Sequence, residues 1–238
     1  MSLTDKTHRR GFLGRVLGAA AAFGVTGAVE PAEAQPAGGG HDDWIKGVKG
    51  THRCLFDFPQ HKNLMPQLHI LNYLNTYHEA YKTTPGQVGA VGTFYSLGQQ
   101  ASISLAFNDA MWAKYSLGEY LGLKDASGKP YTRNVFNKVT EADGHLVMSA
   151  IQSPPIPALA PALPALGIEN LQKMGTTFLL CANAFGGWCA ELEARGKGKA
   201  PELMKELQAN MLPGVIMVPA MVIAIEAAQK AGMAYNRQ

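Results

Sequence analysis

Cysteine is scarce in this sequence, and its spacing excludes several kinds of site. The chain has three cysteines among 238 residues, Cys54, Cys181 and Cys189, and no Cys-x-x-Cys pair. So small and odd a number excludes a disulfide framework, and the missing pair removes the spacing of a thioredoxin-type redox motif or a cysteine zinc site. Any cysteine chemistry must therefore use a single thiol.

Several other motifs are absent. The sequence has no Gly-x-Gly-x-x-Gly, no phosphate loop and no Gly-x-Ser-x-Gly elbow, which argues against nucleotide binding and ordinary serine hydrolysis. It has no block of Lys and Arg interleaved with aromatic residues, so no nucleic-acid partner is expected. Four histidines crowd one region without the spacing of a ligand pair, so neither a metal site nor another cofactor is expected; they are His52, His61, His69 and His78.

The first 34 residues have the pattern of an export signal. Arg9 and Arg10 precede an apolar stretch over 16–29, and the small residues of 32–34 form an Ala-x-Ala cleavage site. This pattern predicts a twin-arginine secretory signal over residues 1–34, which delivers a folded protein to the periplasm. A retained anchor would need about 20 strongly apolar residues, so no stable membrane anchor is expected after cleavage. The alternative is a disordered N-terminal tail.

The remaining 204 residues are enough for one domain of ordinary size. Residues 35–50 contain Pro, Gly, Ala and isolated charges without an apolar period, which is typical of a flexible linker. The sequence therefore predicts a single domain over residues 51–238. The formal net charge of +3 for the whole chain does not imply an acidic partner.

Apolar patterning predicts strands that alternate with helices through this domain. Short apolar runs that end at Pro, Gly or a helix start indicate strands, and they occur at 54–58, 87–95, 176–181, 214–218 and 233–237. Helical spacing with suitable caps occurs at 64–81, 110–121, 168–174, 182–194, 201–210 and 220–230. Residues 153–164 contain five prolines, which predicts a rigid surface segment, either a lid or a subunit contact.

This alternation predicts a single-domain α/β protein with a mainly parallel five-stranded sheet and helices on both faces, layered as in flavodoxin. Ligands and reactive groups in such sheets collect at the carboxyl ends of the strands. Asp57, Tyr95 and Cys181 come at the ends of three predicted strands. The carboxyl edge is therefore the expected location of a site.

Cys181 is the sharpest candidate for chemistry. It is the last residue of a predicted strand, directly before a helix. The amides at a helix N-terminus favour a thiolate, which could accept a sulfane sulfur, and Asn183 could help to orient that sulfur. The alternative is that Cys181 is a small buried residue of the core, as cysteine often is. We expect Cys54 and Cys189 to be packing residues.

Three segments carry a resemblance to a known family. They are residues 108–119, the strand that leads into Cys181-Ala-Asn183, and residues 212–219 together with 229–235. In these segments the chain resembles the exported branch of the DsrE/DsrF-like family. The resemblance implies a five-stranded parallel α/β domain, trimers or hexamers, and a persulfide-carrying cysteine after the fourth strand, a position that it assigns to Cys181. It supports the fold more than the activity.

Two functions from different classes remain open. The first is a periplasmic sulfur carrier or sulfurtransferase with Cys181 as nucleophile and Asn183 beside it, whose partner is a sulfur donor or acceptor. The second is a non-catalytic protein that binds a small ligand or assembles with itself, with a pocket at the strand ends formed by Asp57, His61, Tyr95, Asn108 and Trp112. A helix cap is the alternative role of Asn108. A metal-handling module through the histidines is a weaker third hypothesis.

Overall fold

Five parallel strands form one sheet in the order β4-β3-β2-β1-β5. The computed structural model describes residues 40–238, so the predicted export signal lies outside the described residues. The fold class predicted from the sequence, a mainly parallel sheet with helices on both faces, is confirmed. The strands are β1 His52–Asp57, β2 Val88–Phe94, β3 Thr176–Cys181, β4 Val215–Val218 and β5 Ala234–Arg237.

Burial differs sharply between the centre and the edge of this sheet. All seven residues of β2 are buried, as expected for a central parallel strand that is covered on both faces. All four residues of β5 are exposed, although β5 pairs with β1 in a register that sets Arg237 opposite Asp57. The edge of the sheet formed by β5 is therefore exposed to solvent.

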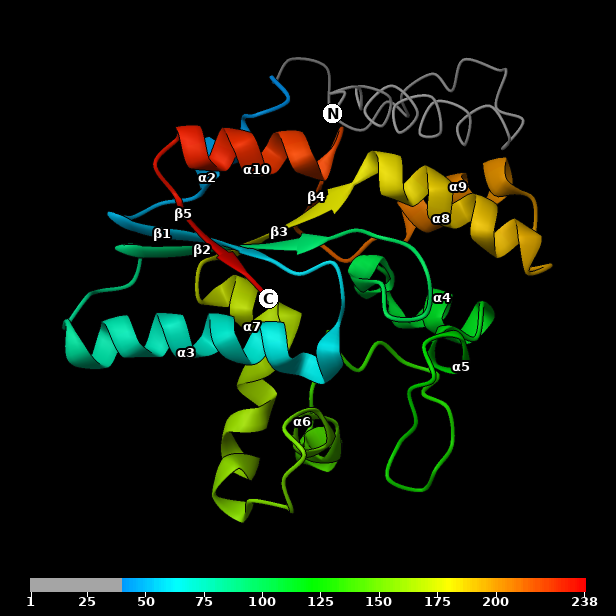
Figure 1. Ribbon diagram of the computed structural model, residues 1–238, viewed down its shortest axis with the longest axis horizontal. Coiled ribbons are helices and arrows are strands. Elements are labelled where there is room, and N and C mark those ends of the chain that lie inside the picture. The colour runs from blue at the N-terminus through cyan, green and yellow to red at the C-terminus, as the bar shows by residue number, and fades with distance from the viewer. Residues whose placement is uncertain (1–39) are drawn as a thin grey trace, which may run out of the picture. The chain divides into compact units, whose positions relative to one another are not determined.

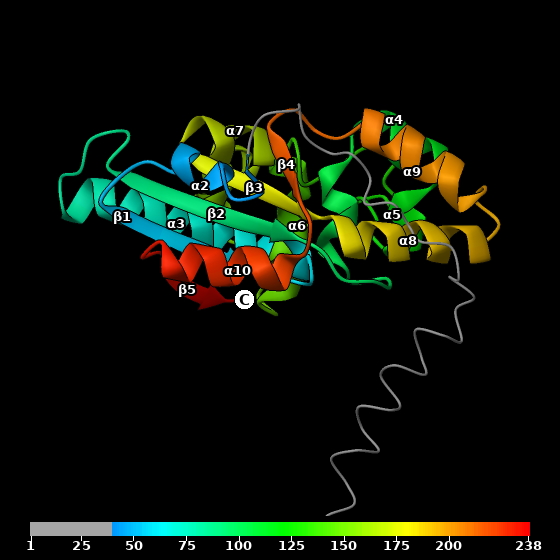
Figure 2. The same cartoon turned by 90° about the horizontal axis from the view of Figure 1, so that it is seen from above.

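Helices cover both faces of the sheet, as Figure 1 and Figure 2 show. Helix α3 (Met65–Ala80) connects β1 to β2, and α10 (Met221–Lys230) connects β4 to β5. Strands β2 to β4 are added on one side of β1 and β5 on the other. Right-handed crossovers therefore place α10 on the face opposite α3. The short helix α2 (Trp44–Gly47) lies on the α10 side and α7 (Ile168–Lys173) on the α3 side.

The longest connection joins β2 to β3. It contains α7, the helices α4 (Asp109–Lys114), α5 (Leu117–Tyr120) and α6 (Gly144–Ala150), and the 3₁₀ segments η2 (Ser102–Ala106), η3 (Glu141–Asp143) and η4 (Pro157–Leu166). Between β3 and β4 the chain forms α8 (Ala182–Ala194) and α9 (Ala200–Ala209), and η1 (Lys62–Leu64) precedes α3. The predicted strand and helix positions after residue 167 agree with these bounds to within two residues.

The folded part begins earlier than the sequence suggests. Trp44 and Val48 lie in the segment expected to be a flexible linker, yet each is only 4 % exposed. Both pack into the cluster between the sheet and α10, together with Leu55 and Val91. A single helical turn with two apolar residues is too short to show a period, so the pattern of residues 35–50 could not reveal this packing.

The helix predicted over 110–121 is interrupted. Ser116 has a left-handed φ of 54°, and the segment divides into α4 and α5. Two residues later, Gly118 lets the backbone of α5 approach residue 131 closely, because a Cβ there would lie 2.1 Å from the carbonyl oxygen of Tyr131. The contact depends on the missing Cβ, so helical periodicity cannot predict it.

The proline-rich segment 153–164 forms neither a regular α-helix nor a strand, as predicted. Most of it belongs to η4, a run of 3₁₀ turns in which Leu163 and Leu166 face the core. Proline lacks the amide that an α-helix needs, and three-residue turns tolerate the loss better. With α6, η4 forms the part of the molecule farthest below the sheet in Figure 1.

Candidate functional site

The sulfur of Cys181 lies between the beginnings of two helices. Cys181 is the last residue of β3 and the N-cap of α8, where its Sγ accepts a hydrogen bond from the amide of Ala184 at 3.4 Å. The amide of Met221, the first residue of α10, donates to the same sulfur at 3.3 Å. Two amide donors stabilise negative charge on sulfur. The sequence indicated that α8 would contact Cys181, but not that α10 would do so as well.

The side chain of Cys181 is buried. It is 5 % exposed and packs in the apolar cluster with Leu179 and Val218. It lines neither the cavity between α3 and β5 nor the one beside Asp143. Asn183 is exposed, and its side chain makes no hydrogen bond to the sulfur in the described part of the chain. Cys181 also ends the third strand in chain order, whereas the resemblance implies a position after the fourth.

The other two thiols are packing residues in the structure. Cys54 and Cys189 are buried and free. Burial raises the pKa of Cys54 to about 11 and that of Cys189 to about 12. Both thiols therefore stay protonated near neutral pH.

Asp57 is the centre of a polar cluster at the carboxyl ends of β1, β2 and β5. Its carboxylate, 1 % exposed, accepts hydrogen bonds from the hydroxyls of Tyr95 at 2.7 Å and Tyr235 at 2.6 Å. A guanidinium nitrogen of Arg237 lies 3.5 Å from the same carboxylate. Burial, with the adjacent carboxylate, raises the pKa of Tyr95, so its phenol remains a donor. The cluster ties the C-terminal strand to β1.

His61 lies elsewhere, in a closed apolar site. It is 1 % exposed, and its ring centroid lies 5.3 Å from that of Phe136. Its Nδ1 accepts from the amide of Asn63, and its Nε2 has no hydrogen-bond partner among the described residues. Burial lowers the pKa of His61 to about 4, against a weaker opposing effect of the Gln99 carbonyl. The imidazole is thus neutral at physiological pH.

Trp112 and Asn108 have structural roles. The fully buried indole of Trp112 packs 6.1 Å from the ring of Phe136 and donates to the Ser104 carbonyl at 3.1 Å. Asn108 caps α4 by accepting from the amide of Met111 at 3.2 Å, the role considered as its alternative. Of the five predicted pocket residues, Asp57 and Tyr95 are joined by a side-chain hydrogen bond, and Asn108 and Trp112 by a backbone hydrogen bond at the start of α4, but the structure does not gather all five around one pocket.

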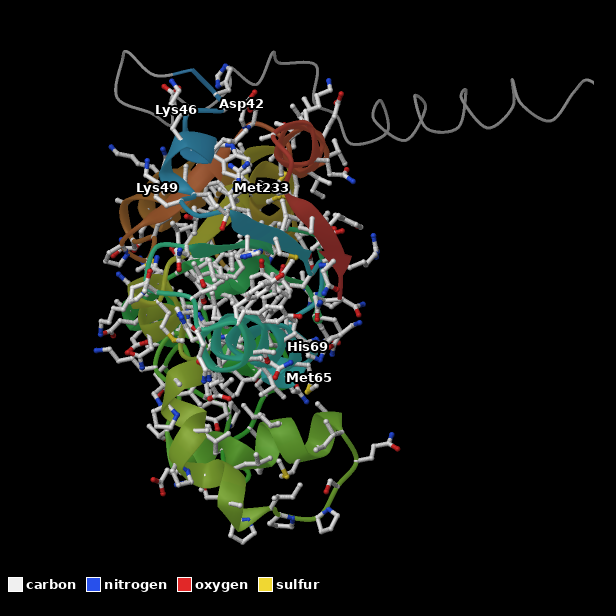
Figure 3. The ribbon with its side chains drawn as sticks, turned by 90° about the vertical axis from the view of Figure 1, so that its left-hand side faces the viewer. Asp42, Lys46, Lys49, Met65, His69 and Met233 are labelled. Carbon is white, nitrogen blue, oxygen red and sulfur yellow. The ribbon has the colours of Figure 1, made fainter. Side chains whose placement is uncertain are left out.

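A groove between α3 and β5 is the larger of the two cavities, with a volume of about 630 Å³. We call it the α3–β5 groove. In Figure 3, Met65 and His69 lie on the side of α3 along which β5 runs. The groove is lined by Phe56, Lys62, Met65, His69, Asn72, Tyr73, Thr76, Tyr77, Tyr81, Asn236, Arg237 and Gln238.

Aromatic rings form one part of this groove. The rings of Tyr73 and Tyr77 lie 5.0 Å apart, and those of Tyr77 and Tyr81 lie 5.1 Å apart. Phe56 packs edge-on to Tyr73 at 5.5 Å. Tyr73, Tyr77 and Tyr81 are four residues apart, so the sequence places them on one face of a helix, where they form a tyrosine stripe. That the stripe would line a cavity depends on the position of β5.

Polar groups form the other end of the groove. Lys62 lies before α3, while Arg237 and Gln238 come from the C-terminal segment. The imidazole of His69 is in hydrogen-bond contact with the side chain of Gln238, which joins the two walls. No acidic side chain and no cysteine is among the lining residues.

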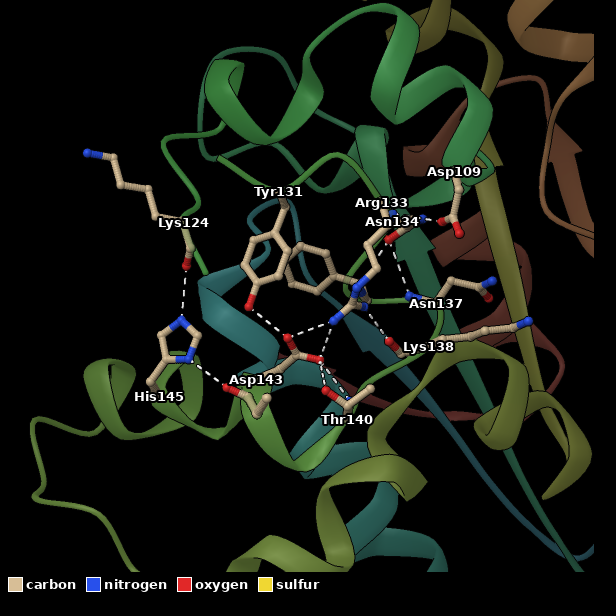
Figure 4. A network of polar contacts seen from close by, with 12 residues as sticks. Asp109, Lys124, Tyr131, Arg133, Asn134, Asn137, Lys138, Thr140, Asp143 and His145 are labelled. Carbon is tan, nitrogen blue, oxygen red and sulfur yellow. Dashed lines mark hydrogen bonds and ion pairs between the residues drawn. The ribbon is translucent and has the colours of Figure 1, made fainter. Parts of the chain in front are cut away.

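The second cavity, of about 400 Å³, lies over a closed ionic network (Figure 4). Asp143 accepts two short hydrogen bonds from Arg133, one from the Tyr131 hydroxyl at 2.7 Å, and two from the amide and hydroxyl of Thr140. Burial acts to raise the pKa of Asp143, but these partners hold it below its usual value. These bonds occupy both oxygens of the carboxylate and hold Tyr131, Arg133 and Thr140 together within the 123–145 segment.

Comparison with known proteins adds no relative: no protein-family model, no curated protein and no solved structure matches the chain. Within residues 40–238, no group of three or more His, Cys, Asp or Glu residues is arranged to hold a metal ion. In the same range, every helix is too short or too polar to cross a membrane.

Proposed function

We propose that this chain is a non-catalytic binding protein that holds a small ligand in the α3–β5 groove. The observation that carries the proposal is the lining of the groove, which combines aromatic rings, amides and cations but contains no cysteine, no serine and no acidic side chain. A volume of about 630 Å³ is in the range typical of small-molecule sites. Such walls bind and orient a ligand but lack a paired nucleophile and base.

The Asp57 cluster supports this proposal by fixing one wall of the groove. Strand β5 is exposed along its length and has only four residues. The hydrogen bond from the Tyr235 hydroxyl to the Asp57 carboxylate and the one from the Gln238 amide to the Asp57 carbonyl, at 2.9 Å, hold that strand against β1. A pre-formed wall lowers the entropy cost of ligand binding.

A groove-filling substitution tests the proposal. Thr76 lines the groove and is exposed, whereas the adjacent Asn75 is equally exposed but does not line it. A thermal-shift screen with a library of small metabolites should find compounds that stabilise the wild type and Asn75→Trp but not Thr76→Trp. Equal stabilisation of both variants, or no stabilising compound in the library, would overturn the proposal.

A second candidate function is sulfur carriage at Cys181, as the DsrE/DsrF-like resemblance implies. The observation in its favour is the pair of amide donors from Ala184 and Met221, which would stabilise a thiolate. The thiolate would attack the sulfane sulfur of a donor, forming a persulfide as the donor's leaving group departs. Because the sulfur is 5 % exposed, the route requires opening of the α8–α10 junction.

Mass spectrometry tests the second candidate. After treatment with a polysulfide, the wild type should gain the mass of one sulfur atom and Cys181→Ser should not. Absence of labelling in the wild type, or equal labelling of Cys181→Ser, would eliminate sulfur carriage. Cys54→Ser serves as the matched control, since Cys54 also lies in a strand and is buried.

We also propose that the protein is exported to the periplasm by the twin-arginine route and assembles there as a trimer or hexamer. The arginine pair and the Ala-x-Ala site of residues 1–34 support export, and the DsrE/DsrF-like resemblance is what implies the assembly. Cell fractionation should recover a mature chain that begins at Gln35, and Arg9→Lys with Arg10→Lys should retain the precursor in the cytoplasm. Light scattering on the mature protein tests the assembly, and a monomer would contradict it.

A further inference from the structure

We infer that His61 is a pH-sensitive latch, which holds one end of the α3–β5 groove in its binding conformation and releases it when the imidazole is protonated. The inference rests on the proposed function and adds a means of regulating the same site. It is carried by the hydrogen bonds of His61, by the backbone conformation of the next three residues and by their place in the groove lining. The proton comes from solvent.

Three residues in the left-handed conformation follow His61. Their φ angles are 39° at Lys62, 49° at Asn63 and 74° at Leu64. None of the three is glycine, and a Cβ makes this conformation unfavourable, least so for asparagine. Such residues persist only where surrounding contacts hold them, and they gather at binding sites and switches. The segment 62–64 therefore relaxes when its contacts are lost.

His61 holds this segment through both its side chain and its backbone. Its Nδ1 accepts a hydrogen bond from the Asn63 amide at 3.2 Å, and its own amide donates to the Gln100 carbonyl at 2.9 Å. Because Nδ1 accepts, the neutral imidazole carries its proton on Nε2. The ring is buried against Phe136. The latch is therefore a neutral imidazole in a closed site.

Protonation removes the bond that holds Asn63. Both nitrogens of an imidazolium carry a proton, so Nδ1 can no longer accept from the Asn63 amide. The charged ring also lacks a counter-ion, since burial is the main cause that lowers the pKa of His61 and no charged side chain contributes to it. Each ionisable group on the elements around His61 is exposed or has another partner; these groups are Tyr95, Arg133, Lys138, Asp143, His145 and the adjacent Lys62. An imidazolium at this position is therefore favoured only after the segment opens toward solvent.

The segment that His61 holds also forms one end of the groove. Lys62 and Met65 line the groove, and the buried Leu64 directly precedes the first residue of α3. Figure 3 shows Met65 near His69 on this part of α3. When the segment 62–64 relaxes, Lys62 and Met65 leave their positions and the groove loses part of its lining. Acid pH should therefore weaken binding in the groove.

Hydrogen exchange of the mature protein, followed by mass spectrometry at about pH 7 and about pH 5, tests the latch. With a pKa of about 4 in the closed form and 6.5 in the open form, the equilibrium constant for opening rises about twentyfold between the two pH values. Protection factors over residues 59–69 should fall by this factor in the wild type. They should not fall in His61→Asn, whose Oδ1 can replace Nδ1 as the acceptor but does not titrate. His61→Phe, which keeps a ring without an acceptor, should give low protection at both pH values.

The outcomes separate the latch from global unfolding and from the proposed function. Unchanged protection over 59–69 in the wild type, or the same loss in His61→Asn, would overturn the role of His61. Strand β2 reports unfolding of the whole domain, so protection over 59–69 as high as that of β2 would overturn a local opening. A loss confined to 59–64, with 65–69 unchanged, would overturn the link to the groove. A thermal-shift screen that finds no groove compound would overturn ligand binding whatever the exchange result.

Discussion

The amide nitrogen of Met221 lies 3.3 Å from the sulfur of Cys181, 40 residues earlier in the chain. This contact joins the start of α10 to the end of β3 and adds a second amide donor to that of Ala184. The same contact that would stabilise a thiolate also covers it. Access to the sulfur, rather than its electrostatic environment, therefore decides whether Cys181 can react.

Thiol accessibility gives the first prediction. We expect no rapid reaction of the native protein with Ellman's reagent, because Cys54, Cys181 and Cys189 are all buried. The raised pKa values of Cys54, about 11, and Cys189, about 12, slow their reaction further. In urea all three thiols should react. A fast native reaction that disappears in Cys181→Ser would show that the α8–α10 junction opens, and would favour sulfur carriage.

The Asp57 cluster gives a prediction about stability. Tyr235→Phe removes one hydrogen bond to a buried carboxylate and should lower the free energy of unfolding by about 1 to 3 kcal/mol. Tyr95→Phe should have a similar effect. Tyr81→Phe is the control, because no hydrogen bond from the Tyr81 hydroxyl exists within the described residues, and it should change stability by less than about 0.5 kcal/mol. Urea denaturation measures all three.

If Tyr235→Phe were as stable as the wild type, the C-terminal strand would not depend on this contact. The pre-formed wall of the groove would then need another explanation. A double-mutant cycle between Tyr235→Phe and Asp57→Asn isolates the coupling between the two side chains from the separate effect of each change.

His61 predicts a dependence of stability on pH. Its pKa is about 4 in the folded chain and 6.5 as the ordinary value. Between these values the unfolded chain binds more protons than the folded chain, so the free energy of unfolding falls as the pH falls through this window, by at most about 3 kcal/mol from this group. Above pH 6.5 the group contributes no pH dependence.

Urea unfolding of the wild type and His61→Gln at about pH 7 and about pH 5 measures this contribution. The wild type should lose more stability between the two pH values than the variant. His41→Gln is the control, because His41 is exposed, and this variant should behave as the wild type. Equal pH dependence of the wild type and His61→Gln would mean that the buried imidazole is not held neutral.

The Asp143 network predicts a large effect of a single substitution. Asp143→Asn removes the charge partner of Arg133, whose Nη2 donates to both carboxylate oxygens, and should destabilise the protein by about 2 to 3 kcal/mol, because the Arg133 side chain is itself only partly buried. Glu141→Gln, two residues away and exposed, should change stability by less than about 0.5 kcal/mol. Thermal unfolding of both variants provides the comparison. A small effect of Asp143→Asn would show that the 123–145 segment holds its conformation without this ion pair.

Local pattern was sufficient for most of the elements. The strand 176–181 and the helix 182–194 were predicted with the bounds that the structure has, because a buried apolar run next to a helical period is a local signal. The break at Ser116 and the close approach of Gly118 to the Tyr131 carbonyl were missed, because contacts between separate segments leave no local period. The buried Trp44 was missed for a similar reason, since its packing partners lie on β1, β2 and α10.

The candidate site was less predictable. The carboxyl-edge rule placed Asp57 and Tyr95 correctly beside each other, but their partners Tyr235 and Arg237 are about 180 residues away from Asp57. His61 and Trp112, expected in the same pocket, instead pack around Phe136. The tyrosine stripe of α3 was readable as one face of a helix, but its role in lining a groove was not.

The amino-acid sequence by itself determined the parallel α/β class, the order of the elements along the chain and the location of Cys181 between a strand and a helix. These features follow from periods of two and 3.6 residues and from local caps, which act over a few residues. Only the tertiary structure decided that β5 lies beside β1, that Met221 covers Cys181 and that a groove opens between α3 and β5. These contacts join distant segments, so their energies depend on how the whole sheet is ordered.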